Sequence, residues 1–165
     1  MSTLQHFTDA LDTQYDESAS KALGKDYWRV IDSFRFYLND PADSYVEISS
    51  GYLTDGASVP RLFWSLLPPW GDYGQAAVVH DKLCETLTVV HAETGAIVAI
   101  DRAQADKAFK QAMEVLQVPQ WKRNVMYIAV RVYAFVSGKN KRDIIQAKED
   151  YEKAWMALQQ KPAVA

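Results

Sequence analysis

The spacing of apolar residues changes along this chain, from every second residue to every third or fourth residue. Between Trp28 and Leu38, aromatic and aliphatic side chains alternate with polar ones, a pattern typical of a half-buried strand. After Tyr73, apolar residues recur at spacings of three and four, a pattern typical of amphipathic helices. Strands that precede helices in this way predict an α+β fold, with a small N-terminal antiparallel sheet followed by a bundle of about four helices.

Turn and capping residues set the expected boundaries of these elements. Residues 1–24 are expected to form an N-terminal arm with a short helix around Thr8–Leu11, residues 25–160 a single α+β domain, and residues 161–165 a C-terminal tail. Thr94-Gly95 lies between two apolar runs and predicts a hairpin within residues 91–100. The expected strands are Trp28–Leu38 and Tyr45–Ser50, and the expected helices are Tyr73–Thr86 capped by Asp72, Arg102–Gln117 capped by Asp101, Gln120–Ser137 ended by Gly138, and Lys141–Gln160.

Composition argues against several classes of protein. A length of 165 residues suits one domain with a substantial core, and a net charge of −3 argues against a general nucleic-acid binder. The single cysteine, Cys84, excludes an internal disulfide. The longest apolar run, Val125–Val136, contains Arg131 and is too short to span a bilayer, so no transmembrane segment is expected. The N-terminus has no secretory signal pattern, which makes synthesis in the cytoplasm the expectation.

An aspartate lies on the apolar face of the expected helix 102–117. Arg102, Asp106, Phe109 and Met113 share this face, and a buried carboxylate needs a partner. Arg102, one turn earlier, is the local candidate. His80, on the preceding helix, is the other: if the two helices pack antiparallel, Asp106 would bind one imidazole nitrogen and leave the other as a general base. A purely structural role for His80 is the alternative.

Asp81 follows His80 directly and gives the region a second possible chemistry. An adjacent histidine and aspartate could serve a metal ion, since carboxylate oxygens suit calcium and imidazole suits zinc. Asp55, in the preceding loop Thr54–Arg61, could supply a second carboxylate to the same ion. Asp55 and Asp81 are therefore the candidate metal ligands, and calcium or zinc the candidate cofactors.

The same loop carries two candidate substrate-binding residues. Gly56 and Pro60 give it a restricted, shaped backbone. Arg61 could hold an anionic group of a substrate, although a salt bridge from Arg61 to Asp55 is the simpler account. Ser58 could contact substrate, but no G-x-S-x-G motif surrounds it to indicate a serine nucleophile.

The run Val125–Val136 is apolar on more than one face. Val125, Ile128 and Val132 lie on one face, and Met126 and Val130 lie on another. This pattern predicts the central helix of the domain. The alternative is a surface for self-association or for docking on a larger assembly.

Three motifs together resemble a known family. They are TDGAS-x-P-R from Thr54, HD-x-L from His80, and R-x-x-x-D-x-x-F-x-x-A-M from Arg102, and the resemblance covers about residues 28–138. The family consists of small domain-of-unknown-function proteins found in tailed-phage and prophage genomes. The resemblance implies a phage or prophage origin, with synthesis in the host cytoplasm and a possible place in the virion.

A second likeness concerns the layout of the site. Secreted calcium-dependent phospholipases also place a His-Asp pair on one helix, oppose it with an aspartate from another helix, and approach it with a glycine-bearing loop. This resemblance implies that His80 activates water, that Asp106 orients His80, and that Asp81 with loop carbonyls holds calcium. The disulfides of those enzymes are missing here.

The sequence therefore leads to a phage-encoded hydrolase-like protein with a site formed by Asp55, His80, Asp81 and Asp106. A second interpretation is a non-enzymatic virion or assembly component that contacts phage structural proteins or itself, in which the same residues form a structural polar network. An inhibitor of host defence is a third. An enzyme needs a water-reachable hollow at His80, whereas a structural network would be closed.

Overall fold

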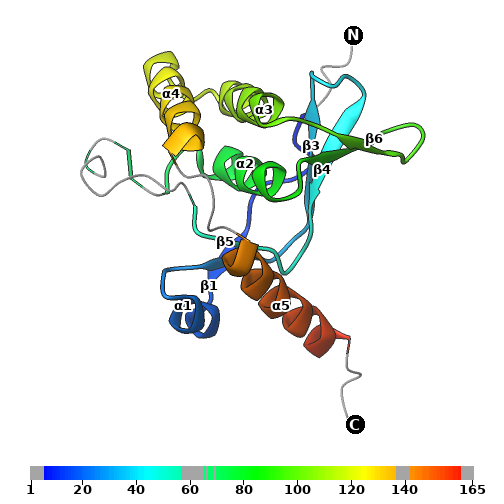
Figure 1. Cartoon of the computed structure of the whole chain (residues 1–165), viewed down its shortest axis with the longest axis vertical. Coiled ribbons are helices and arrows are strands. Elements are labelled where there is room, and N and C mark those ends of the chain that lie inside the picture. Colours follow the sequence, from blue (N-terminus) through cyan, green and yellow to red (C-terminus); the bar gives the residue numbers. More distant parts are fainter. Residues whose placement is uncertain (1–5, 57–64, 66, 69, 137–141, 161–165) are drawn as a thin grey trace.

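The computed structural model describes residues 6–56, 65, 67, 68, 70–136 and 142–160. Over these residues the chain forms two antiparallel sheets and five helices, which confirms the α+β prediction (Figure 1). The strand orders are β1-β2-β5 in one sheet and β3-β4-β6-β7 in the other. In chain order the elements are β1 (Thr13–Tyr15), α1 (Glu17–Leu23), β2 (Trp28–Val30), β3 (Phe34–Leu38), β4 (Ser44–Ile48), β5 (Leu53–Thr54), α2 (Gly74–Thr86), β6 (Thr88–His91), β7 (Ile97–Ala99), α3 (Arg102–Val115), α4 (Gln120–Val136) and α5 (Arg142–Gln159).

The predicted single strand Trp28–Leu38 is wrong, because it consists of two strands in different sheets. Strand β2 pairs with β1 and β5, whereas β3 pairs with β4. The break lies at residues 31–33, where Asp32 and Ser33 are exposed. Both residues favour turns and end the pairing, while the apolar alternation continues on either side of them. The predicted hairpin within residues 91–100 is confirmed by the pairing of β6 with β7.

The helix predicted around Thr8–Leu11 is also wrong. The first helix is α1, which begins after Asp16 and ends at Gly24. The Asp16 carboxylate accepts a hydrogen bond from the Ala19 backbone amide, and Gly24 adopts φ 76° at the other end. This pair of caps was the missed signal. Phe7 does anchor the N-terminal segment. It is buried, and its ring packs at a tilt against Phe36 of β3, with 4.6 Å between the ring centroids.

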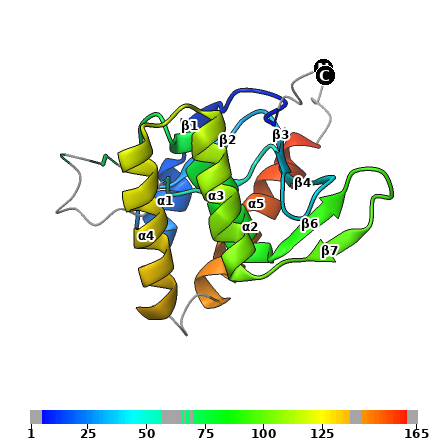
Figure 2. The same cartoon turned by 90° about the horizontal axis from the view of Figure 1, so that it is seen from above.

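Helices α2, α3 and α4 form a layer beside the β3-β4-β6-β7 sheet (Figure 2). Helix α2 packs on α3 and on β4, and α3 packs on α4. The Asp101 cap is confirmed, since its side chain accepts from the Gln104 amide in a capping box. The Asp72 cap is wrong: α2 begins after Tyr73 without a side-chain cap, and the Asp72 carboxylate accepts from Lys122 at 3.2 Å instead. The predicted end at Gly138 lies outside the described residues.

Helix α4 is not the central helix that its apolar sequence predicted. Its buried face includes Met126, which contacts the core. An exposed stripe runs along another face, because α4 lies at the outside of the layer and, among the described elements, packs mainly on α3 (Figure 2). The stripe consists of Trp121, Val125, Ile128 and Val132, which are 48%, 43%, 60% and 57% exposed.

Helix α5 joins the molecule at the other end, next to α1 and the small sheet (Figure 1). Its Trp155 ring packs against Gly51 and lies 5.2 Å from the guanidinium of Arg29. Arg29 is buried, donates to the Gly51 carbonyl at 2.8 Å, and forms an ion pair with Asp16 at 2.6 Å. These contacts connect α5 to β2 and to the cap of α1.

Gly51 should tolerate no side chain, because φ is 92° and an added Cβ would lie 2.7 Å from the Trp155 ring. We expect Gly51→Ala to lower the free energy of unfolding by about 2–4 kcal/mol, from left-handed strain plus displacement of the ring. Gly24→Ala is the matched control, since it has φ 76° and no atom within 4 Å of the added Cβ, and it should lose only about 1 kcal/mol. Urea denaturation of both variants measures the difference. If both variants lost the same free energy of unfolding, the close contact between Gly51 and the Trp155 ring would contribute nothing to stability.

Candidate functional site

The site begins with the small-residue face of α2. Tyr73, Ala76, Ala77 and His80 are all buried, and the alanines allow α3 to approach closely enough for His80 to reach Asp106. His80 Nε2 donates to Asp106 Oδ1 at 2.7 Å. The ring also stacks on Phe109, one turn after Asp106, with 4.7 Å between ring centroids. The two candidate catalytic residues of the sequence are therefore brought together.

Three helices supply donors to the Asp106 carboxylate. Besides His80 of α2, Arg102 Nε of α3 donates to Oδ1 at 3.0 Å, and an Arg131 guanidinium nitrogen of α4 lies 3.4 Å from Oδ2. Arg102 and His80 were predicted as alternative partners of Asp106, and the structure contains both. Arg131 was missed because nothing in the sequence places α4 over α3.

Burial and hydrogen bonding act in opposite directions on Asp106. Burial alone would raise the pKa of its carboxyl, but hydrogen bonds from His80 and Arg102 favour the ionised form, and the net pKa lies below its ordinary value. Asp106 is 0% exposed, and the His80 side chain is 9% exposed. Both members of the pair are therefore buried, and the little exposure that remains belongs to the imidazole.

Cys84 is the third chemical group at this point. It lies one helical turn after His80, and its Sγ is 3.4 Å from His80 Nε2. Within the described residues, His80, Cys84 and Asp106 form a group whose possible metal-binding atoms all lie within 4.8 Å of one another. Cys84 was not among the predicted site residues, although its spacing of four from His80 was the available signal.

Asp81 points to a different neighbourhood, toward β5 and the start of the following loop. Thr54 Oγ1 donates to Asp81 Oδ2 at 3.3 Å, and the Gly56 amide donates to Thr54 Oγ1 at 3.1 Å. Burial raises the pKa of the Asp81 carboxyl well above its ordinary value, and the negative charge and hydrogen bond of Asp55 raise it further. Asp55 itself is paired with Lys25. The two candidate metal ligands are thus neighbours of each other.

Tyr52, Glu85 and Lys148 extend this second neighbourhood. Lys148 of α5 is buried, forms an ion pair with Glu85, and places its ammonium 3.9 Å from the Tyr52 ring centroid. The Tyr52 hydroxyl is buried and has no hydrogen-bond partner of good geometry among the described residues. Burial and the nearby charges of Glu85 and Asp81 raise the pKa of this phenol well above its ordinary value. Acidic groups are therefore clustered on this side of α2, and Lys25 and Lys148 neutralise part of their charge.

The four predicted site residues consequently form two pairs. His80 and Asp106 meet between α2 and α3, and Asp55 and Asp81 meet between β5 and α2. Neither Asp55 nor Asp81 belongs to the described group of possible metal-binding atoms around His80. The predicted substrate-binding residues, Ser58 and Arg61, lie outside the described residues.

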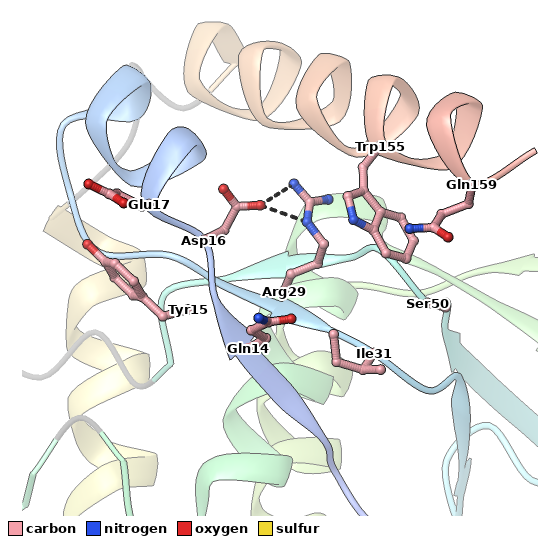
Figure 3. Close-up of a pocket in the computed structure, with 9 residues that line it drawn as sticks. All are labelled: Gln14, Tyr15, Asp16, Glu17, Arg29, Ile31, Ser50, Trp155 and Gln159. Atoms are coloured by element: carbon pink, nitrogen blue, oxygen red, sulfur yellow. Dashed lines mark hydrogen bonds and ion pairs between the residues drawn. The ribbon is translucent and has the colours of Figure 1, made fainter. Parts of the chain in front are cut away.

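A pocket of about 590 Å³ opens elsewhere, at the junction of α1, β2 and α5 (Figure 3). The ion pair between Asp16 and Arg29 lies at its centre, with Trp155 beside the guanidinium. No predicted site residue lines it. Because Arg29 is already neutralised by Asp16 and bonded to the Gly51 carbonyl, we regard its polar lining as part of the α5 attachment. Its full lining is Gln14, Tyr15, Asp16, Glu17, Arg29, Ile31, Ser50, Trp155 and Gln159.

Fold and site together define a class of protein: an α+β domain with a buried His-Asp pair between two helices and an adjacent aspartate on the first of them. The chain belongs to the family described as "Protein of unknown function (DUF1353)", whose profile matches residues 28–130. The predicted membership of a domain-of-unknown-function family is thereby confirmed.

One similar protein is the "Uncharacterized protein y4jT" of Sinorhizobium fredii (strain NBRC 101917 / NGR234). It is 34% identical over 100 residues, which make up 59% of this chain and 26% of that protein. The matched part is thus about a quarter of the relative. No solved structure matches the chain. Across the described residues, no helix is long and apolar enough to cross a membrane.

The two aspartates should respond oppositely to removal of their charge. Folding raises the pKa of Asp81, so this group favours the folded state below its ordinary value of 3.8 and loses that contribution as pH rises through the folded pKa. We expect Asp81→Asn to raise stability near neutral pH by on the order of 1 kcal/mol, or about 2–4 °C in Tm, and to have little effect in acid.

Asp106→Asn is the matched comparison. Folding lowers the pKa of Asp106, so its contribution is present above 3.8 and is lost as pH falls through the folded pKa. The substitution should cost about 2–4 kcal/mol near neutral pH, because it leaves buried donors facing a neutral amide. Thermal unfolding across the acid and neutral range measures both variants. A large loss of stability in Asp81→Asn near neutral pH would contradict this prediction. It would show that other groups of the folded protein stabilise the ionised Asp81 carboxylate.

Proposed function

We propose that this protein is a hydrolase of carboxylic esters, with His80 as the general base and Asp106 as the residue that orients it. The observation that carries the proposal is the 2.7 Å bond from His80 Nε2 to a carboxylate that is 0% exposed and ionised. Such a bond fixes the ring and its tautomer and stabilises the imidazolium that proton abstraction creates. Proton transfer by the ring is then assigned to Nδ1.

The reaction follows from this assignment. His80 Nδ1 takes a proton from water as the water oxygen attacks the ester carbonyl carbon. The tetrahedral intermediate then breaks its bond to the alcohol oxygen, which receives the proton back from the imidazolium. The products are a carboxylic acid and an alcohol, and the ring returns to its neutral form.

Asp55 and Asp81 fit a calcium ion in this proposal. Their carboxyl groups lie close together at two partly exposed residues. Burial and the charge of Asp55 raise the pKa of Asp81, a penalty that a bound divalent cation would relieve. They would supply two of the roughly six to eight oxygen ligands that calcium takes. When bound, the ion would polarise the ester carbonyl. Ser58 and Arg61 are proposed to contact an anionic group of the substrate.

We also propose a phage or prophage origin. It is supported by the motif resemblance over residues 28–138. Synthesis in the host cytoplasm and association with the virion are part of the same proposal.

Ester hydrolysis is tested with a chromogenic carboxylic ester and with an anionic phospholipid dispersed in detergent, each in calcium and in a chelator. We expect His80→Gln to reduce the rate at least about 100-fold, the lower range of a general base. His91→Gln is the matched control, since His91 lies on the β6-β7 hairpin and should leave the rate unchanged. Asp81→Asn should abolish the response to calcium.

Two results would contradict the proposal. One is a wild-type rate no higher than the blank for both esters. The other is a folded His80→Gln variant, checked by circular dichroism, that keeps the wild-type rate. An unfolded His80→Gln variant would favour a structural role for the ring.

A virion or assembly component is the second candidate, and the exposed apolar stripe of α4 favours it. In that case α4 would contact another protein or a second copy of the chain, and Asp106 would serve to hold three helices together. Ile128→Glu should then abolish association seen by sedimentation. Leu158→Glu, at a residue of α5 with 64% exposure, is the control and should leave it unchanged.

A further inference from the structure

We propose that His80, Cys84 and Asp106 form a binding site for zinc or a similar transition-metal ion, distinct from the proposed calcium ligands. The three side chains offer an imidazole nitrogen, a thiolate and a carboxylate oxygen, which is a ligand set that zinc accepts. Their candidate atoms all lie within 4.8 Å of one another. A solvent molecule would complete four-coordination. The thiolate favours zinc and cobalt over calcium.

The geometry of α2 fixes two of the ligands. His80 and Cys84 are four residues apart on one helix, and Nε2 and Sγ are separated by 3.4 Å. Two such ligands of one tetrahedral zinc stand about 3.6 Å apart, given bonds of about 2.0 and 2.3 Å. The observed spacing needs almost no adjustment, and both residues are held by a regular helix that packs on α3.

Asp106 must move slightly to take part. Its Oδ1 is 2.7 Å from Nε2, whereas two light-atom ligands of one zinc stand about 3.4 Å apart. The metal would therefore replace the proton of the His80–Asp106 hydrogen bond and lengthen that separation. The neutral ring then carries its proton on Nδ1, and binding releases the thiol proton of Cys84.

The two arginines set a limit on affinity. Arg102 and Arg131 already neutralise Asp106, and a divalent ion would repel both guanidinium groups. Their side chains are 30% and 41% exposed, so solvent screens part of this repulsion. Removal of one of these guanidinium charges should therefore strengthen metal binding at this site. Metal bound elsewhere on the surface would not respond to the change.

One consequence depends on the proposed function. A metal on His80 Nε2 breaks the bond that orients the general base, so zinc should inhibit ester hydrolysis. The site itself does not depend on that activity, because it requires only the three side chains and their spacing.

Cobalt(II) tests the site, since a cobalt–thiolate bond gives a charge-transfer band in the near ultraviolet, and Cys84 is the single cysteine of the chain. We expect the reduced full-length protein to show this band and to saturate at one cobalt per chain. Cys84→Ser should remove the band, and His80→Gln should weaken binding at least tenfold. His91→Gln is the control and should behave as wild type.

Arg102→Gln gives the sharper comparison. It should tighten cobalt binding roughly tenfold, because Co²⁺ binding with loss of the Cys84 thiol proton adds one net positive charge about 6 Å from the guanidinium, at an effective dielectric constant of about 40. Thermal unfolding confirms that each variant is folded. Absence of the thiolate band in folded wild-type protein, or a band unaffected by His80→Gln, would overturn the metal site. Either result would leave the hydrolase proposal intact, because that proposal is tested by rates in zinc-free buffer.

Discussion

The buried carboxylate of Asp106 is the interaction on which the arrangement of α2, α3 and α4 depends. An ionised group without solvent needs compensating donors, and three helices each contribute one, through His80, Arg102 and Arg131. Apolar packing already restricts how these helices fit together, and the carboxylate adds a directional constraint. The carboxylate permits fewer positions, because all three donors must reach two oxygen atoms.

The fold was predictable where local chemistry decides the structure. The apolar alternation around Phe34, the hairpin turn at Thr94-Gly95 and the Asp101 cap all depend on residues close together in sequence. The prediction was wrong where tertiary context decides it. The alternation through Trp28–Leu38 cannot reveal a change of sheet, and the apolar sequence of α4 cannot reveal that one of its faces is exposed.

The candidate site was predictable to the same extent. An aspartate on an apolar stripe must have a partner, and this argument offered Arg102 and His80, both of which donate to Asp106. It could not place Asp55 and Asp81 relative to that pair, since a loop position depends on the strand before it and the helix after it. Adjacent residues on a helix point about 100° apart, and His80 and Asp81 accordingly face different neighbours.

The two faces of α2 help to decide whether the buried polar residues stabilise the fold or bind a ligand. A scaffold should stabilise the fold, and the surroundings of Asp106 do so by favouring its charged form. The surroundings of Asp81 do the opposite, because burial and the charge of Asp55 disfavour its ionisation. A purely structural role gives no reason to keep an acid there, since an amide of the same shape would avoid the penalty. A bound divalent cation would relieve that penalty. The His80–Asp106 pair is a separate arrangement, buried and closed as a structural network requires, so it is the Asp81 side of α2 that points to a bound ion.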